Sequence, residues 1–402
     1  MTIVFTLAAM FALLLIRVPV AFALGGLGLG MLIFGGFSPL MAPQAILSTL
    51  DGFILLAVPL FLLMSNTLLR AGVGNYLFAA VSAWVGHWPG GLAVATILSC
   101  GVFAAISGSS VATAATIGTV AIPEMINRGY NKRFVYGLLA AGGTLGILIP
   151  PSIPMIIYGF VTEESVIALF LAGIGPGIAL LVLFIIFSMV YARLGGQERE
   201  PKRDWAERKR ATFKALPSVL LAVLIIGGIY SGAFTPTEAA AIGFAAALII
   251  TAAMRVLTWE KLKLAIFDSM ATTVAIILII AGAKVFGKAI TLYRIPQDIS
   301  VMISQGIDTQ LGFILVVSVV LLIMGLVFEA LSMVLIMTPV LLPAALALGF
   351  DPVWFGVYMV IMVECALITP PVGLNLYVIQ SVAKTRLGEV ARGVLPFLLL
   401  MF

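Results

Sequence analysis

Charged residues, histidine and cysteine are all scarce in this chain of 402 residues. Asp, Glu, Lys and Arg make up 10% of the sequence, hydrophobic residues make up 62%, and the mean hydropathy is +1.21. About 25% charged residues would be usual in a soluble globular domain. The composition therefore excludes an ordinary soluble protein and indicates a chain that lies mostly in lipid.

The same scarcity argues against an enzyme. The single histidine, His87, stands beside Trp88 and Pro89, where an interfacial role is expected rather than a catalytic one. Cys100 and Cys365 lie in separate apolar segments, so their expected role is packing. No cofactor is predicted, because the sequence offers no nucleophile–base set and no cluster of transition-metal ligands.

The net charge of +5 is concentrated at a few points. Eight of the 22 Lys and Arg residues lie between Arg193 and Lys214, which predicts a cytoplasmic loop and gives no indication of nucleic acid. Counting crossings outward from this loop places the N-terminus on the outer, periplasmic side. Lys284, Lys288 and Arg294 fall on the outer side too; they argue weakly against this topology or mark an outer contact surface.

Apolar segments long enough to cross about 30 Å of hydrocarbon recur from end to end. Residues 1–36 predict two crossings, with Arg17 between them at the inner surface. Two segments, 39–50 and 258–267, are expected to lie along the membrane surface. Residues 384–402 are expected to begin a last helix that continues beyond this sequence.

A polar, helix-breaking segment occurs twice, deep in apolar sequence. The first copy, residues 142–152, contains the pair that begins at Pro150, and the second, residues 364–375, contains the pair that begins at Pro370, 220 residues later. Lipid satisfies no free backbone N–H or C=O group, so such breaks survive only where they are buried in protein or line a cavity. Paired breaks in two halves of a membrane chain indicate the binding site of a transporter.

Two further apolar segments, 90–127 and 311–348, have polar residues in the middle. In the topology above each begins and ends on one side, and 38 residues form only about 57 Å of helix. Each is therefore predicted to be a re-entrant helical hairpin; two full crossings with a tight turn are the alternative. The first hairpin opens inward and the second outward, which predicts inverted repeats.

These features predict an all-α polytopic membrane protein with two re-entrant hairpins and two broken helices. Scaffold helices and an interfacial segment are expected in 1–89, and the basic loop with further scaffold helices in 193–310. The transport elements of the first repeat are expected in 90–192, with a broken helix at 134–160, and those of the second in 311–383, with a broken helix at 354–383. Residues 384–402 would form the start of a last helix.

Cation binding is expected where the four interruptions meet, because hairpin tips and helix breaks expose carbonyl and hydroxyl oxygens near the midplane. Small hard cations prefer oxygen ligands, and carbonyl dipoles can replace the water around Na⁺. The predicted Na⁺ ligands are Ser107, Ser109, Ser110, Gly143 and Thr144 for a first site, and Gly325, Glu329, Ser332, Thr369 and Gly373 for a second. For any one of these residues, close helix packing is the simpler interpretation.

Glu329 and Glu364 have no acidic counterparts in the first half and lie at predicted membrane depth. Intramembrane carboxylates are costly and usually functional. Glu329 is expected to bind Na⁺ or to tie the hairpin tip through hydrogen bonds. Glu364 is interpreted equally well as a structural partner of a backbone N–H. If both were dry and unpaired they would be protonated at pH 7, so proton coupling is the alternative.

An anionic substrate is implied by the same breaks. The second hairpin arms and the second half-helices point their N-termini at one volume, where free N–H groups attract carboxylates. The predicted substrate contacts are Ser110, Pro151, Ser152, Ser332, Pro371 and Asn375. The alternative is that these N-termini are capped by their own side chains, above all at Ser152.

Six motifs are specific when taken together: Arg17-Val-Pro19-Val-Ala-Phe, Ala57-Val-Pro59-Leu-Phe61, Ser107-Gly-Ser109-Ser110-Val-Ala-Thr113, Gly146-Ile-Leu-Ile-Pro150-Pro151-Ser152, Thr235-Pro-Thr-Glu238-Ala and Thr369-Pro-Pro-Val-Gly373. In them, and over nearly the whole chain, the sequence resembles the large membrane (M) subunit of tripartite ATP-independent periplasmic (TRAP) transporters of the dicarboxylate or sialic-acid type.

The resemblance implies Na⁺-driven symport of small carboxylates across a bacterial inner membrane by an elevator motion, within the ion-transporter superfamily. It also implies two partners. A periplasmic solute-binding (P) subunit would deliver the substrate, and a small four-helix membrane (Q) subunit would brace the scaffold. The main alternative is a single-component carboxylate or anion transporter, with proton coupling as an option; dependence on a separate binding protein distinguishes the two.

Overall fold

The computed structural model describes residues 2–16, 18–196, 201–306, 309–326, 328–371 and 373–402. Within these ranges the secondary structure is helical throughout, with no strand. The predicted place of Arg17 at the inner surface lies outside the described residues, as do Val327 and Val372. Six of the described helices are long and apolar enough to cross a membrane, and one bent pair would make a seventh.

The helices before the first hairpin are short. They are α1 (Thr2–Leu15), α2 (Val20–Phe34), α3 (Met41–Leu50), a 3₁₀ turn at Phe53–Leu56, α4 (Ala57–Arg70) and α5 (Val73–Val85). The prediction of two apolar helices in residues 1–36 corresponds to α1 and α2, and α3 forms a separate helix in residues 39–50 as expected. The division between α4 and α5 was not predicted.

The three longest described helices lie in the middle of the chain: α10 (Val166–Leu194), α11 (Trp205–Tyr230) and α13 (Trp259–Leu292). Helix α12 (Pro236–Ala253) lies between the last two. Helix α12 begins with a capping box, in which the Thr235 hydroxyl accepts from the Glu238 N–H and the Glu238 carboxylate accepts from the Thr235 N–H. The prediction of a separate surface helix at 258–267 is wrong. That segment forms the first turns of α13, because no proline or glycine interrupts the sequence before Gly282.

The four predicted interruptions are all present. The hairpins are α6 (Gly91–Ser107) with α7 (Ser110–Asn127), and α15 (Gln310–Met324) with α16 (Ala330–Ala347). The broken helices are α8 (Lys132–Leu148) with α9 (Ile153–Thr162), and α17 (Pro352–Ile368) with α18 (Leu374–Ala383). Helix α14 (Ile295–Gly306), which was not predicted, precedes the second hairpin, and α19 (Leu387–Met401) follows the second broken helix.

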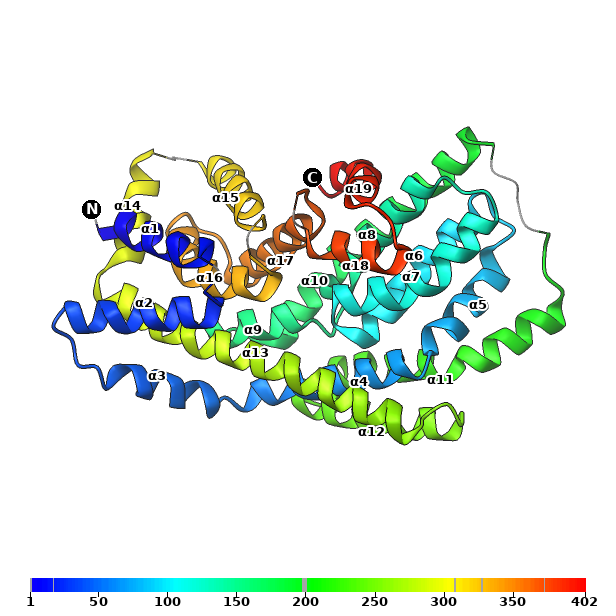
Figure 1. Ribbon diagram of the computed structural model, residues 1–402, viewed down its shortest axis with the longest axis horizontal. Helices are drawn as coiled ribbons and strands as arrows, with labels where there is room; N and C mark the ends of the chain where they lie inside the picture. Colours follow the sequence, from blue (N-terminus) through cyan, green and yellow to red (C-terminus); the bar gives the residue numbers. More distant parts are fainter. Residues whose placement is uncertain (1, 17, 197–200, 307–308, 327, 372) are drawn as a thin grey trace.

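The hairpins and broken helices gather on one side of the molecule. In Figure 1 they lie above α3, α4, α12 and α13, which run along the lower edge. Helix α13 packs against α2, α3 and α4, while α7 packs against α8 and α18, and α16 packs against α9 and α17. The two repeats therefore interlock with each other and share an interface with the long helices.

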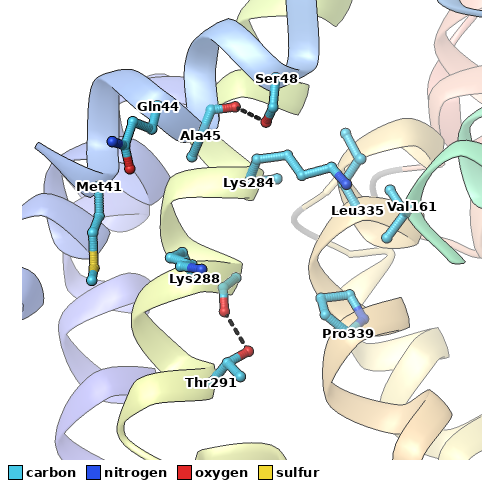
Figure 2. Close-up of a pocket in the computed structure, with 12 residues that line it drawn as sticks. Met41, Gln44, Ala45, Ser48, Val161, Lys284, Lys288, Thr291, Leu335 and Pro339 are labelled. Carbon is cyan, nitrogen blue, oxygen red and sulfur yellow. Dashed lines mark hydrogen bonds between the residues drawn. The ribbon is translucent and has the colours of Figure 1, made fainter. Parts of the chain in front are cut away.

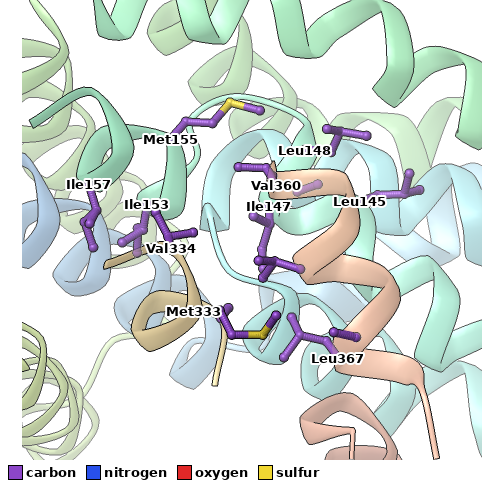
Figure 3. Close-up of a cluster of buried hydrophobic side chains, with 14 of the residues drawn as sticks. Leu145, Ile147, Leu148, Ile153, Met155, Ile157, Met333, Val334, Val360 and Leu367 are labelled. Atoms are coloured by element: carbon purple, nitrogen blue, oxygen red, sulfur yellow. The ribbon is translucent and has the colours of Figure 1, made fainter. Parts of the chain in front are cut away.

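A buried apolar cluster joins the two repeats at their breaks (Figure 3). It includes Leu145, Leu148 and Met155 beside the first break and Met333 and Val360 from the second repeat. Each of these side chains is fully buried. Burial of apolar area stabilises this arrangement by about 25 cal/mol per Å² for the part removed from water, and close packing fixes the relative position of the two breaks.

Candidate cation and substrate site

The four interruptions meet at one central cavity of about 320 Å³. Its wall includes Ser109 and Ser110 from the first hairpin tip and Glu329 from the second. Ile153 and Leu374, the first residues of α9 and α18, line it from the two breaks. The structure thus brings together the elements that the sequence predicted would meet.

The first tip concentrates oxygen atoms. Gly108 turns the chain at φ 61°, and the hydroxyl of Ser109 then accepts from the Ala112 N–H at 3.4 Å, which caps α7. The Ser107 hydroxyl lies 2.8 Å from the Thr113 hydroxyl, and Thr113 donates to the Ser109 carbonyl at 2.9 Å. Two buried hydroxyls and one carbonyl therefore converge within a single turn.

This tip packs directly against the first broken helix. A Cβ atom added to Gly146 would lie 2.6 Å from the Ser109 carbonyl oxygen, and one added to Gly143 would lie 3.1 Å from the Ser110 carbonyl oxygen. Glycine is needed there because any side chain would push the tip away. Ser107, Ser109, Ser110 and Gly143 are thus neighbours, as predicted for a first cation site. The Thr144 hydroxyl is buried and donates to the Ala141 carbonyl at 2.6 Å.

Asn375 lies beside the same place. Its side-chain N–H donates to the Ala140 carbonyl at 3.2 Å, and its nitrogen is 3.3 Å from a Cβ position on Gly143. The amide is fully buried, and its Oδ1 has no hydrogen-bond partner. Asn375, predicted as a substrate contact, is therefore placed against α8 next to the first tip and is not among the residues that line the central cavity.

The second tip is built differently. Glu329 is accessible from the central cavity and accepts a long hydrogen bond, 3.4 Å, from the Ser332 hydroxyl. Gly325 packs on α17, where an added Cβ would lie 2.2 Å from the Cβ of Ala366. Glu329 and Ser332 are thus joined, whereas Gly325 belongs to a packing contact between helices.

The remaining predicted ligands of the second site lie at the second break. The Thr369 hydroxyl donates to the Cys365 carbonyl at 2.6 Å, within its own helix end. Gly373 lies close to the same helix end, since an added Cβ would be 2.9 Å from the Leu367 carbonyl oxygen. Leu367 also lines the central cavity, so this break borders the same space as Glu329.

The predicted substrate residues fall in several environments. Ser110 lines the central cavity, whereas Ser332 and Ser152 are fully buried. Ser152 accepts from the Met155 N–H at 3.3 Å, so it caps α9, as the alternative interpretation proposed. The remaining two are Pro151, which is buried with its carbonyl against Gly108, and Pro371, which is exposed.

Part of the cavity wall was not predicted. Ser65 and Asn66 from α4 and Thr272 from α13 face the hairpin tips across the cavity. Asn66 donates to the Ser269 hydroxyl at 2.9 Å, and Arg70 pairs with Asp268 one turn further on. The signal available in the sequence was a run of polar residues inside two otherwise apolar segments.

Glu364 lies apart from the cavity. It is fully buried in α17 and faces the backbone of Leu148 at the first break, yet neither carboxyl oxygen forms a hydrogen bond of standard geometry. Among the described residues, no three His, Cys, Asp or Glu side chains come close enough to hold a metal ion. The oxygen atoms near the tips are hydroxyls, carbonyls and one carboxylate, a set suited to a hard monovalent cation.

An all-α membrane protein whose two inverted halves bring hairpin tips and helix breaks to one cavity is a secondary transporter. The architecture is similar to the crystal structure of the YdaH transporter from Alcanivorax borkumensis, with a TM-score of 0.57 and 15% identity over 87% of this chain and 82% of that one. At this identity the likeness concerns the fold alone.

The family follows from the sequence comparison. The family model for the DctM component of tripartite ATP-independent periplasmic transporters matches residues 7–402, and the chain belongs to this family. It is 41% identical to the C4-dicarboxylate TRAP transporter large permease protein DctM of Pseudomonas aeruginosa, over 88% of this chain and 83% of that protein.

A second relative is the sialic acid TRAP transporter large permease protein SiaM of Vibrio cholerae. This chain is 35% identical to it, over 97% of this chain and 92% of the relative. The resemblance to the large TRAP subunit is therefore confirmed. The chain is a multi-pass membrane transport protein and not an enzyme.

Proposed function

We propose that this chain is the Na⁺-coupled membrane subunit that imports a small organic acid across a bacterial inner membrane. The observation that carries the proposal is the central cavity, where both hairpin tips and both helix breaks contribute to one wall. The relatives named for C4-dicarboxylates and sialic acid support a carboxylate substrate, such as one of these or a related acid.

The first Na⁺ is assigned to the neutral tip. Ser107, Ser109 and Ser110 would contribute oxygens together with the Gly143–Thr144 backbone. Asn375 would add its unpartnered Oδ1, since its side-chain nitrogen lies 3.3 Å from a Cβ position on Gly143. Carbonyl and amide oxygens suit Na⁺ because they replace its hydration shell without adding formal charge. A second Na⁺ is assigned to the other tip, where Glu329 and Ser332 would bind it with the Gly325, Thr369 and Gly373 region.

The substrate is assigned to the central cavity itself. Its volume lies at the lower end of the range for small-molecule sites, about 300–1,000 Å³. The N-termini of α7 and α16 open onto it at Ser110 and Ala330 and offer free N–H groups to a carboxylate. The other residues predicted as substrate contacts would shape this volume without all touching the solute; they are Pro151, Ser152, Ser332, Pro371 and Asn375.

An elevator motion accounts for the division of the cavity wall. Its tips and breaks belong to the hairpin side of the molecule, whereas Asn66 and Thr272 belong to α4 and α13, which lie along the opposite side. Sliding one set past the other would carry the solute across the membrane. The family is tripartite, so a periplasmic binding protein and a small membrane subunit are the expected partners.

The voltage sets a limit on stoichiometry. Each Na⁺ that enters down a 100 mV inside-negative potential supplies about 2.3 kcal/mol. Two Na⁺ with a dianion would gain nothing from the voltage, so electrogenic uptake of a dicarboxylate needs a third cation. A proton-coupled carrier is the second candidate, favoured by the fully buried carboxyl of Glu364, which has no hydrogen-bond partner of standard geometry.

The test is uptake of labelled succinate and sialic acid into proteoliposomes that contain the chain and its small membrane partner. Uptake is measured with and without a Na⁺ gradient and the solute-loaded binding protein. Ser109→Ala and Ser110→Ala should raise the Na⁺ concentration for half-maximal uptake, whereas Ser231→Ala, in the exposed turn after α11, should not. Uptake driven by protons alone, or without the binding protein, would reject the proposal.

A further inference from the structure

A second and larger cavity, of about 540 Å³, lies between α3, α13 and α16 (Figure 2). Helix α3 contributes Gln44 and Ser48 to its wall, and α13 contributes Lys284, Lys288 and Thr291. The opposite wall is formed by Val161 at the end of α9 and by Leu335 and Pro339 of α16. This cavity therefore lies on the same boundary between the long helices and the hairpin side as the central cavity.

The charge of this cavity has one sign. Lys284 and Lys288 stand one turn apart on the same face of α13, and no Asp or Glu is among the described residues that line it. Neither lysine forms an ion pair within the described ranges, where Arg70–Asp268 and Arg128–Glu124 are the pairs present. The Glu163 carboxylate attracts the Lys284 ammonium electrostatically but forms no ion pair with it. The cavity thus has two ammonium groups beside hydroxyl and amide groups, and no carboxylate among its described lining residues neutralises them. Such a site is suited to an anion.

Lys284 reaches across the cavity. Figure 2 shows its side chain extending from α13 toward Leu335 and Val161. Its Nζ lies 4.7 Å from the centroid of the Phe160 ring on α9. The side chain is half-buried, so part of its hydration has been replaced by an aromatic face. A carboxylate in the cavity would meet an ammonium group that is partly desolvated and therefore attracts it more strongly than a free surface lysine would.

The two cavities follow one another along the same helices. On α13, Thr272 and Ile276 line the central cavity, and Lys284 lines the second one about 12 Å further along the axis. On α16, Ala330 and Leu331 line the central cavity and Leu335 the second. The basic loop 193–214 predicts the end with Trp259 to be cytoplasmic, so the lysine cavity lies on the outer side of the central one.

We propose that the cavity lined by Lys284 and Lys288 is a separate anion-binding site that receives the carboxylate group of the solute before it enters the central cavity. This inference rests on the proposed function for the identity of the solute. Lysine cavities with low-dielectric walls concentrate anions and raise their local encounter rate by 10-fold or more. Lysines on the outer side are unexpected from membrane topology alone. Binding of the solute's carboxylate gives these two a role.

A thiol placed in the cavity tests this directly. The two native cysteines, Cys100 and Cys365, are both buried, so Thr291→Cys adds an exposed thiol beside both lysines. An anionic thiosulfonate reagent should modify this thiol about tenfold faster than a cationic one of similar size, and succinate should slow the reaction while succinamide should not. The binding protein is left out, so protection by succinate cannot come from protein docking.

The lysines are then removed in the Thr291→Cys background. Lys288→Gln and the double change Lys284→Gln/Lys288→Gln should reduce both the charge preference and the protection, whereas Lys284→Arg should keep them. Lys263→Gln, which removes an exposed lysine near the opposite end of α13, is the matched control. Since Lys288 is exposed, its single variant should fold even if the double variant does not. Equal protection with and without the lysines, or none with them, would overturn the proposal.

Uptake separates this inference from the proposed function. In the lysine variants, the solute concentration for half-maximal uptake should rise about tenfold while the Na⁺ dependence stays as in the unmodified chain. Na⁺-driven uptake that is unchanged in the variants would overturn the lysine site alone. If uptake by the unmodified chain does not depend on Na⁺, the proposed coupling is rejected. The labelling result would still decide whether the anion site exists.

Discussion

The tip of the first hairpin is neutral and tightly packed, whereas the tip of the second carries a carboxylate that is accessible from the central cavity. In the first repeat, Gly146 of the broken helix lets the Ser109 carbonyl approach; in the second, the residue 220 positions later is Ala366, and the glycine stands on the hairpin instead, at Gly325. In each repeat a glycine lets the hairpin approach its broken helix closely, but the glycine stands on the broken helix in the first repeat and on the hairpin in the second. Two repeats with the same topology can therefore carry different functional groups at their hairpin tips.

This difference has a physical meaning for binding. A set of hydroxyl and carbonyl oxygens is held in place by helix packing and costs little to bury while its hydrogen bonds are satisfied. A carboxylate such as Glu329 attracts a cation more strongly, but it also needs water or a counter-ion whenever the site is empty. The two tips should therefore differ in how strongly each depends on packing and on charge.

The largest effect is expected from Gly146→Ala. The new methyl group would lie 2.6 Å from the Ser109 carbonyl oxygen and from the Thr113 hydroxyl, and backbone has little freedom to move aside. Overpacking of this kind costs about 1–3 kcal/mol, so most Na⁺-driven uptake should be lost. Gly175→Ala, where an added Cβ meets nothing within 4 Å, is the control. Normal uptake by Gly146→Ala would show that the first tip does not depend on this contact.

The next effect concerns the charged tip. Glu329→Gln should raise the Na⁺ concentration for half-maximal uptake by about tenfold or more, because it removes a formal charge from the proposed second cation site. Glu364→Gln should leave that concentration nearly unchanged, since Glu364 is buried away from the central cavity. The measurement is the Na⁺ dependence of uptake at two pH values. A larger effect of Glu364→Gln, together with altered pH dependence, would favour proton coupling.

A smaller effect is expected at Asn375, which connects the second repeat to the first tip. Asn375→Ala removes the hydrogen bond to the Ala140 carbonyl and should destabilise the protein by about 1 kcal/mol. It should also weaken the proposed first Na⁺ site, which would appear as a reduced rise in melting temperature on addition of Na⁺. Tyr377→Phe, an exposed position on the same helix, is the comparison. An unchanged Na⁺-induced rise would remove Asn375 from that site.

The smallest effect is expected on the side of the cavity formed by the long helices. Arg70 and Asp268 form a partly exposed ion pair between α4 and α13. Exposed pairs contribute about 0–1 kcal/mol, so Asp268→Asn should change thermal stability little and leave the Na⁺ dependence intact. A double-mutant cycle with Arg70→Gln measures the pair. A strong change in Na⁺ dependence would mean that cation binding is not confined to the tips.

Much of the fold could be predicted because lipid imposes strict rules on sequence. The Pro-Pro breaks, the serine tip and the apolar lengths identified both hairpins and both broken helices. The surface helix expected at 258–267 was wrong because charge on one face does not end a helix when nothing interrupts it. Helix α14 was missed because it is more polar than the apolar segments on either side and has Pro296, Gln297 and Asp298 in its first turn, a composition typical of a connecting loop.

The site was predicted in part. Hydroxyls and glycines beside helix breaks pointed to Ser107, Ser109, Ser110 and Gly143, which do lie together. Asn66 and Thr272 could not be assigned to the cavity, because the sequence does not show which element faces a polar residue within an apolar helix. The place of Asn375 against α8 likewise depends on how the two repeats interlock.

By itself the sequence determined the solvent, the family, the inverted repeat and the four interruptions, because membrane burial and backbone hydrogen bonding act on residues close together in the chain. Only the tertiary structure decided which oxygens face one cavity, that Asn375 reaches the opposite repeat, and that Lys284 and Lys288 line a cavity of their own. These depend on contacts between residues far apart in the chain, such as Asn375 and Ala140 at a separation of 235 positions, whose geometry is set by the packing of whole helices.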